Sequence, residues 1–199
     1  MMKVPYRMIV LGGLLLTVLM MTGCAPYART VVPLNRDSYV CRNDPGQFNR
    51  YQGKSILLTT IRDESKNTSN LAYYSPEGTI GYQLFYSSEH SIQQPVVSYF
   101  WYALKKGFEC VGVRIEEHGT IYDAELSLTF LSLTDEEIQF RALLTRKGVL
   151  TLQKEYTVTM PKLPAVDKGL LEDRAYRMLD DIVATILTDR DFHKAFFER

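Results

Sequence analysis

The stretch YDAELSLTFLSL (residues 122–133) determines the fold that the sequence predicts. Its apolar residues occupy alternate positions, and acidic or hydroxyl side chains stand between them. The apolar set is Ala124, Leu126, Leu128 and Phe130. A period of two places these side chains on one face of a β-strand and the polar side chains on the other. We therefore expect a sheet with one packed face and one face in water.

Two further segments, 137–146 and 150–160, repeat this alternation. Their apolar sets are Ile138, Phe140, Ala142 and Leu144 in the first, and Leu150, Leu152, Tyr156, Val158 and Met160 in the second, where Lys154 is the exception. Short turns, such as Lys147-Gly148, separate the segments and predict antiparallel hairpins. The turn at 117–119 predicts another hairpin before residue 122.

Upstream, the sequence predicts two strands, a helix and a short strand. Residues 55–61 and 79–86 have the composition of strands. A helix is expected to begin near Pro95, which suits the first helical position, and to end at Gly107 as its left-handed cap. Residues 108–115 then predict a short strand.

The longest periodic segment begins at Asp167, which is the expected N-cap of a second helix. The apolar face of this helix consists of Leu171, Ala175, Met178, Leu179, Ile182, Val183 and Ile186. A final turn near Asp191 is expected to return Phe192 and Phe196 to the core. Leaving the short strand aside, the order is β-β-α-β-β-β-α. This order predicts an α+β two-layer domain, with a mainly antiparallel sheet and both helices on one face.

The first twenty-four residues have the pattern of a secretory signal. Lys3 and Arg7 precede an apolar run that is shorter than the roughly 20 residues a membrane-spanning helix needs. Gly23 and Cys24 close the segment. It resembles a bacterial lipoprotein signal, in which the cysteine becomes the lipidated first residue, although Met21 stands where the consensus has leucine. The alternative is an uncleaved N-terminal membrane anchor.

This resemblance implies a signal peptide at 1–23, a lipidated N-terminus and tether at 24–53, and one periplasmic domain at 54–199. Ala25, rather than aspartate, follows the cysteine, and in such lipoproteins this implies the periplasmic face of the outer membrane. Loss of Lys3 and Arg7 leaves 21 of the 23 basic residues against 23 acidic ones. The chain therefore lacks the basic character of a nucleic-acid-binding protein.

Cys41 and Cys110 are the only thiols that remain once Cys24 is acylated. An even pair of cysteines in an exported chain predicts a disulfide, which here would hold the N-terminal segment to the domain. The alternative is a free thiol at Cys41 and a small buried residue at Cys110.

The sequence contains no motif that predicts an enzyme. The three histidines, His90, His118 and His193, are not spaced from Cys, Asp or Glu as a metal site requires. There is no Gly-x-Ser-x-Gly, Ser-x-x-Lys or phosphate-binding glycine loop. Adjacent carboxylates at 116–117 and 135–137 lie in predicted turns, where water solvates them. We expect no catalytic residue, no metal and no cofactor other than the covalent lipid on Cys24.

Aromatic residues are crowded between positions 73 and 102. They could pack the core with their hydroxyls reaching water, or they could form a surface for an acyl chain, a lipid headgroup or a partner protein. A helix cannot bury four consecutive aromatics at 99–102 on one side, so one or two should face outward. The candidates for such a surface are Tyr82, Tyr86, Tyr99, Trp101 and Tyr102.

The layout resembles a group of small outer-membrane lipoproteins. The stretches that carry the resemblance are LKKGF (104–108) and MLDDIVATILTD (178–189), which is followed by Phe192 and Phe196. The second stretch resembles the ending of the YajG-like family. The element order is also similar to that of the auxiliary lipoproteins of ABC-type intermembrane lipid-transport systems. Neither family supplies catalytic residues.

Two functions are therefore expected. The first is a lipid-anchored binding or adaptor protein that docks on an ABC-type transport complex or another envelope complex, and that contacts lipid. The alternative is a structural or envelope-maintenance lipoprotein, acting at the cell wall or as a self-associating scaffold.

Overall fold

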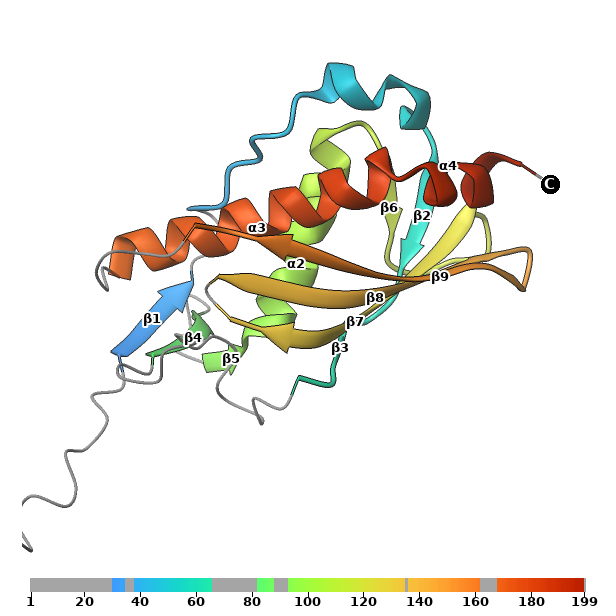
Figure 1. Ribbon diagram of the computed structural model, residues 1–199. Helices are drawn as coiled ribbons and strands as arrows, with labels where there is room; N and C mark the ends of the chain where they lie inside the picture. The colour runs from blue at the N-terminus through green and yellow to red at the C-terminus, as the bar shows by residue number, and fades with distance from the viewer. Residues whose placement is uncertain are drawn as a thin grey trace, which may run out of the picture.

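The computed structural model describes residues 30–34, 38–65, 82–87, 93–134, 136–161 and 168–198. Over these ranges the chain has the predicted α+β fold. Helices pack against a six-stranded mixed sheet, and a smaller three-stranded sheet lies at one end of the molecule (Figure 1). The predicted signal peptide, Cys24 and the predicted helix cap Asp167 lie outside the described residues.

Three strands joined by short turns form the antiparallel part of the larger sheet. They are β7 (Ala124–Leu133), β8 (Glu137–Arg146) and β9 (Val149–Thr159). The predicted alternation is confirmed in β7 and β8, because every member of both apolar sets is fully buried. Tyr156 and Val158 of β9 are also buried, but Leu150 is 53% exposed. The pairing register shifts there, with Leu144 opposite Leu152 and Thr145 opposite Leu150. The extra residue in β9 turns Leu150 onto the other face of the sheet.

The remaining strands of this sheet pair in parallel. β2 (Ser55–Leu58) lies between β6 (Arg114–Glu116) and β7 and is parallel to both, and β3 (Arg62–Asp63) is parallel to β7. The hairpin predicted across 117–119 is therefore wrong. A turn signal shows where a strand ends but not which strand its successor joins. Here Asp123 accepts a 2.8 Å hydrogen bond from the backbone N–H of Ser55, which fixes the start of β7 beside β2.

The smaller sheet consists of β1 (Thr30–Leu34), β4 (Tyr82–Ser87) and β5 (Gln93–Pro95). β4 is parallel to β1 and antiparallel to β5. The strand predicted at 79–86 corresponds to β4. β1 falls in the predicted tether, so paired structure begins well before position 54, where the sequence predicts the domain to start.

Three α-helices complete the described part of the fold: α2 (Val96–Cys110), α3 (Lys168–Thr188) and α4 (Arg190–Phe197). The apolar face predicted for the long helix is confirmed, because all seven of its residues are buried in α3. Phe192 and Phe196 of α4 are also buried, as predicted. α4 lies at the opposite end of the molecule from β1 (Figure 1).

Gly107 lies inside α2 and does not end it. The predicted cap is therefore wrong, because the helix continues to Cys110 and the left-handed residue is Gly112. The strand predicted at 108–115 begins only at Arg114, as β6. A Cβ at position 107 would lie 2.9 Å from Tyr39 Oη and 3.2 Å from Val183 Cγ2. The missing side chain therefore permits the close packing of α2 against α3.

We expect Gly107→Ala to destabilise the protein although alanine favours a helix. Overpacking costs about 1–3 kcal/mol, whereas the gain in helix propensity is about 1 kcal/mol. The net loss should be visible as a lower midpoint of urea unfolding. Tyr39→Phe provides the control, because it removes the nearest oxygen. Gly107→Ala should cost less in that background, and an equal cost in both would contradict this account.

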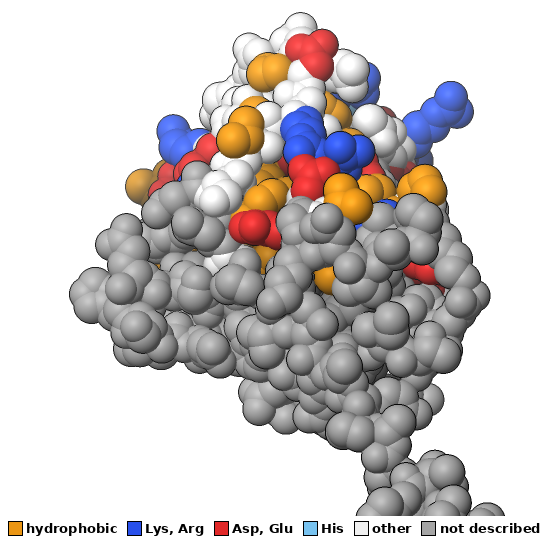
Figure 2. Space-filling view, turned by 90° about the vertical axis from the view of Figure 1, so that its left-hand side faces the viewer, with side chains coloured by type: hydrophobic (Ala, Val, Ile, Leu, Met, Phe, Trp, Pro, Cys, Tyr) orange, Lys and Arg blue, Asp and Glu red, His pale blue; other side chains and the backbone are white. Residues whose placement is uncertain are grey.

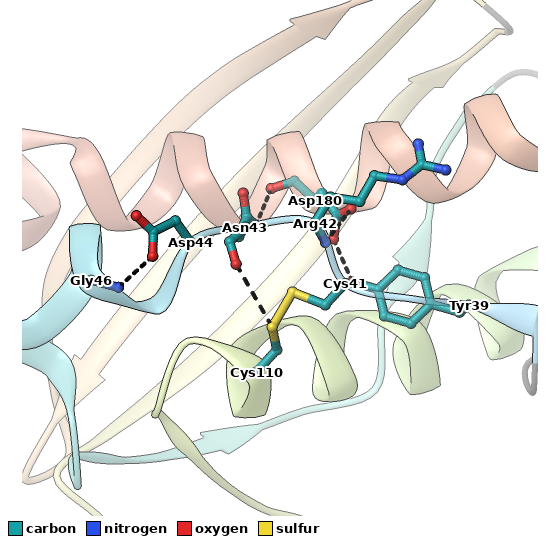
Figure 3. The surroundings of a disulfide bond; sticks show 8 residues. All are labelled: Tyr39, Cys41, Arg42, Asn43, Asp44, Gly46, Cys110 and Asp180. Atoms are coloured by element: carbon teal, nitrogen blue, oxygen red, sulfur yellow. Dashed lines mark hydrogen bonds between the residues drawn. A yellow bond between two sulfur atoms is a disulfide. The ribbon is translucent and has the colours of Figure 1, made fainter.

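Residues 38–44, here called the strap, lie along α3 beside the C-terminal end of α2 (Figure 3) and lead into the 3-10 helix η2 (Pro45–Tyr51). Phe48 and Tyr51 are buried, so this part of the predicted tether is wrong. The segment lacks a hydrophobic period because it packs as irregular chain and one short helix. The predicted disulfide between Cys41 and Cys110 is confirmed, with a Cα–Cα distance of 6.4 Å.

Asp180 of α3 holds the strap in place (Figure 3). Its carboxylate accepts hydrogen bonds from the hydroxyl of Tyr39 at 2.6 Å and from the backbone N–H of Arg42 at 3.2 Å. The side-chain amide of Asn43 donates to the Asp180 carbonyl at 2.9 Å. The Arg42 guanidinium also pairs with Asp173, which lies two turns before Asp180 on the same face of the helix. The strap is thus bound to α3 by hydrogen bonds and to α2 by the disulfide.

Asp180 should give the protein a characteristic pH dependence. Burial raises the pKa of Asp180 above its ordinary value of 3.8, although Tyr39 and Arg42 donate to its carboxylate. A carboxyl group with a raised pKa in the folded state binds its proton more readily there than in the unfolded chain. Its contribution is therefore full below the unfolded pKa and is lost as the pH rises through the folded pKa.

The expected result is that wild-type stability, measured relative to Asp180→Asn, falls as the pH rises from 3.8 toward neutrality. Urea unfolding of both proteins at a series of pH values measures this difference. A difference that is flat or increases with pH would contradict the role assigned to Asp180.

Candidate binding groove beside helix α2

A groove of about 240 Å³ opens where the first turns of α2 meet the chain that follows β2. Its lining residues are Thr60 and Ile61 from that chain, and Val97, Ser98, Trp101 and Tyr102 from the helix. The helical residues are spaced by one turn, so they share one side of α2. The groove therefore combines apolar and aromatic walls with hydroxyl groups, which suits an amphipathic ligand.

Trp101 forms a fixed wall of this groove. Its indole N–H donates to the carbonyl of Thr59 at 3.0 Å and lies 3.3 Å from that of Leu58. The ring of Tyr102 stands nearly perpendicular to the indole, at 88° and with 5.1 Å between centroids. Because the indole N–H is satisfied inside the protein, Trp101 presents its ring to the groove, and the ring is held in one orientation.

The residues of the predicted aromatic surface do not all lie together in the structure. Trp101 and Tyr102 line the groove, and Tyr102 is 38% exposed, so the expectation that at least one aromatic faces outward is confirmed. Tyr99 is fully buried and packs on Tyr176, so its place in the predicted surface is wrong. Successive residues of a helix differ by about 100° in direction, and here positions 99 and 100 point inward. The side chains of Tyr82 and Tyr86 lie outside what the structure describes.

Titratable groups do not converge in this groove. Within the described ranges, no group of three or more His, Cys, Asp or Glu residues could hold a metal ion. His193 packs against the rings of Tyr51 and Phe197, and His118 lies in an exposed turn. Of the paired acids, Glu116 forms an ion pair with Arg114 at 2.8 Å.

A partly buried polar cluster lies elsewhere, and its only sign in the sequence is Lys154, the exception to the alternation in β9. Lys154 pairs with Asp189 at 2.7 Å and Asp191 at 2.6 Å, where α4 begins. Burial, and then the Asp189 carboxylate, raise the pKa of the neighbouring Tyr156. Burial likewise raises the pKa of Tyr51 to about 12. Both phenols stay protonated at neutral pH, so the cluster supports the structure of α4 rather than acid–base chemistry.

The charged side chains of the described part do not segregate on the face seen in Figure 2. Lys and Arg stand beside Asp and Glu there, with hydrophobic side chains between them (Figure 2). This mixture matches a chain of balanced charge. None of the described helices combines the length and the apolar character needed to cross a membrane.

The sequence matches no protein-family model and no curated protein. Solved structures give matches at low sequence identity. Protein XCC0632 from Xanthomonas campestris, described as family-model DUF330, is 13% identical with a TM-score of 0.53, and the match covers 79% of this chain and 92% of that one. An uncharacterized protein is 12% identical with a TM-score of 0.44, over 79% and 98% of the two chains. Lipoprotein GNA1162 from Neisseria meningitidis is 15% identical with a TM-score of 0.25, over 66% and 98%. At these identities, the similarity to the Xanthomonas protein shows a shared fold and nothing about activity.

Proposed function

We propose that this chain is a lipid-anchored envelope protein whose domain binds a partner or a lipid through the groove beside α2, without chemical transformation of what it binds. The observation that carries the proposal is the wall formed by Trp101 and Tyr102, a fixed and partly exposed aromatic pair beside hydroxyl groups. Fixed aromatic side chains offer a large contact area at a low cost in conformational entropy, which is why they are enriched in binding surfaces.

The anchor and the compartment rest on the N-terminal signal pattern and on the disulfide. A disulfide between Cys41 and Cys110 suits an oxidising compartment outside the cytoplasm. Acylation of Cys24 would hold the domain at the periplasmic face of the outer membrane. There it would serve as an accessory of a transport complex, as the auxiliary-lipoprotein resemblance implies.

Photo-crosslinking in cells tests the binding role. A photoreactive phenylalanine analogue replaces Tyr102 in one strain and Ile121 in a control strain, since Ile121 is 85% exposed and outside the groove. We expect a discrete protein or lipid adduct from position 102 alone. Adding Ser98→Arg, which fills the groove with a long charged side chain, should abolish that adduct.

The same experiment can defeat the proposal. The absence of any adduct at 102, or equal adducts at both positions, would remove the groove as the binding site. Adducts of the protein with itself, or its co-sedimentation with purified peptidoglycan, would favour the structural or scaffolding alternative. Labelling with a radioactive fatty acid, compared with a Cys24→Ser variant, tests the anchor independently.

A further inference from the structure

A second surface lies along the outer edge of β9, on a different part of the fold from the groove beside α2. The strand order of the larger sheet is β6-β2-β7-β8-β9, so no described strand pairs with this edge. The N–H of Met160 donates to the carbonyl of Glu136 at 2.8 Å, which places residues 136 and 160 in a hydrogen-bonded pair. Such pairs recur at every second residue of an antiparallel ladder. The backbone groups of Gln153, Glu155 and Thr157 therefore point away from β8, toward the open edge.

Two grooves follow this edge, between β9 and the helices. The first groove, of about 320 Å³, lies between residues 157–159 of β9 and one side of α3. That side consists of Asp181, Ala184, Thr185 and Thr188. The second groove, of about 390 Å³, lies between Leu152 of β9 and Ala195 of α4, with charged residues at its rim. The small side chains on the helices leave room for another backbone beside β9.

The distance between the two grooves suits one extended peptide segment that reaches both. Leu152 and Val158 are six residues apart and belong to the same face of β9, so their separation is about 20 Å. An added strand of seven or more residues would pair with the outward backbone groups between them. Its alternate side chains would enter both grooves, which is the pattern of recognition by strand addition.

The charges along this edge indicate which side chain a bound segment should carry. Lys154 is already engaged by Asp189 and Asp191, and Glu155 by Arg141 at 2.8 Å. Asp181 lines the first groove. The basic group recorded near it is Arg177, one turn away, whose guanidinium forms its ion pair with Asp173 at 2.9 Å. A basic side chain on the bound segment would therefore meet a carboxylate that no described residue contacts as a direct ion pair.

A second copy of this chain fits the edge less well than a single extended segment. Its own α3 and α4 border the same edge and would compete for the space that the first copy's helices occupy. We propose that the β9 edge binds an extended segment of a partner protein by strand addition, with a Lys or Arg of that segment opposite Asp181.

The test uses the full mature chain in detergent and a fluorescein-labelled peptide, VTSTATKT, together with its reversed sequence. Fluorescence anisotropy should show saturable binding of at least one of the two. The same peptide, N-methylated at the alternate residues that face β9, lacks the N–H donors of those residues. It should bind at least tenfold more weakly, because about two hydrogen bonds are lost.

Protein variants separate the backbone and charge contributions. Thr157→Pro removes an N–H that points away from β8, and should weaken binding about fivefold or more. Thr157→Ala keeps that N–H and should bind as the wild type does. Asp181→Lys should weaken binding of the peptide that contains lysine. It should strengthen binding of the same peptide with glutamate in place of that lysine. Urea unfolding checks that each variant is folded.

Three results would overturn the proposal: no saturable binding in either peptide orientation, binding that is unaffected by N-methylation and by Thr157→Pro, or sedimentation as a dimer that Thr157→Pro dissociates. The last result would make a second copy the occupant. None of these results concerns the groove at Trp101. The proposed function would therefore stand or fall by the crosslinking experiment alone.

Discussion

Replacing Cys41 and Cys110 together by alanine is expected to lower the free energy of unfolding by about 4 kcal/mol. The disulfide joins residues separated by 69 positions, so it strongly restricts the unfolded chain. It also holds the strap against α2, next to the contact of Tyr39 with Asp180. Because a domain of this kind is stable by only about 5–15 kcal/mol, the variant should lose a large share of its stability.

Guanidinium unfolding of the wild type and the double variant, without reductant, measures this loss. With dithiothreitol present, the two proteins should unfold at nearly the same concentration, because reduction removes the same constraint from the wild type. Unfolding midpoints that coincide under oxidising conditions would show that the disulfide contributes little. The double variant is preferable to a single one, which would leave a free thiol.

Phe192→Ala is the second substitution with a large expected effect, a loss of about 3–5 kcal/mol. Phe192 is fully buried, and its ring packs on Phe196 and on Tyr51 of η2. Truncation would leave a cavity at the place where α4 closes over the core. Since η2 and α4 meet there, the N-terminal and C-terminal parts of the described fold should loosen together.

Phe197→Ala is the matched control for this prediction. Phe197 belongs to the same helix and also contacts Tyr51, but it is only partly buried. Its truncation should cost less than half as much, as measured by thermal and urea unfolding. Equal losses from the two substitutions would mean that α4 is not docked as the structure shows. Amide hydrogen exchange would then show whether η2 loses protection together with α4.

The parts of the fold that the sequence predicts are those set by local periodicity. Alternating residues in β7 and β8 and the apolar stripe of α3 face the core as expected. Periodicity says nothing about which strands become neighbours. The placement of β2 between β6 and β7 depends on contacts such as that of Asp123 with Ser55, far away in sequence. The hairpin predicted at 117–119 failed for this reason.

Gly107 shows how tertiary packing can overrule a local rule. Two lysines before a glycine are typical of a helix end, yet this glycine is needed inside α2 because Tyr39 and Val183 leave no space for a Cβ. Neither neighbour is near it in the sequence. The strap and η2 were missed on similar grounds, since Phe48 and Tyr51 are buried by a segment that has no period.

The candidate groove was predictable only in part. Helical geometry required that some of residues 99–102 face outward, and Trp101 and Tyr102 line the groove. The sequence could not show that Tyr99 is the residue turned inward, because that depends on the rotation of α2 against Tyr176 of α3. Thr60 and Ile61, on the other wall, had no signal that distinguished them from the end of a strand.

If Cys24 is acylated as proposed, the pairing of Thr30 with Tyr82 in β1 and β4 limits how far the domain can move from the membrane. A tether that ran from Cys24 to residue 53 would extend about 100 Å. The stretch from Cys24 to Thr30 spans at most about 20 Å. With Cys24 acylated as proposed, the body stays within a layer little thicker than itself above the lipid. A partner or lipid that binds this domain would therefore have to enter that layer.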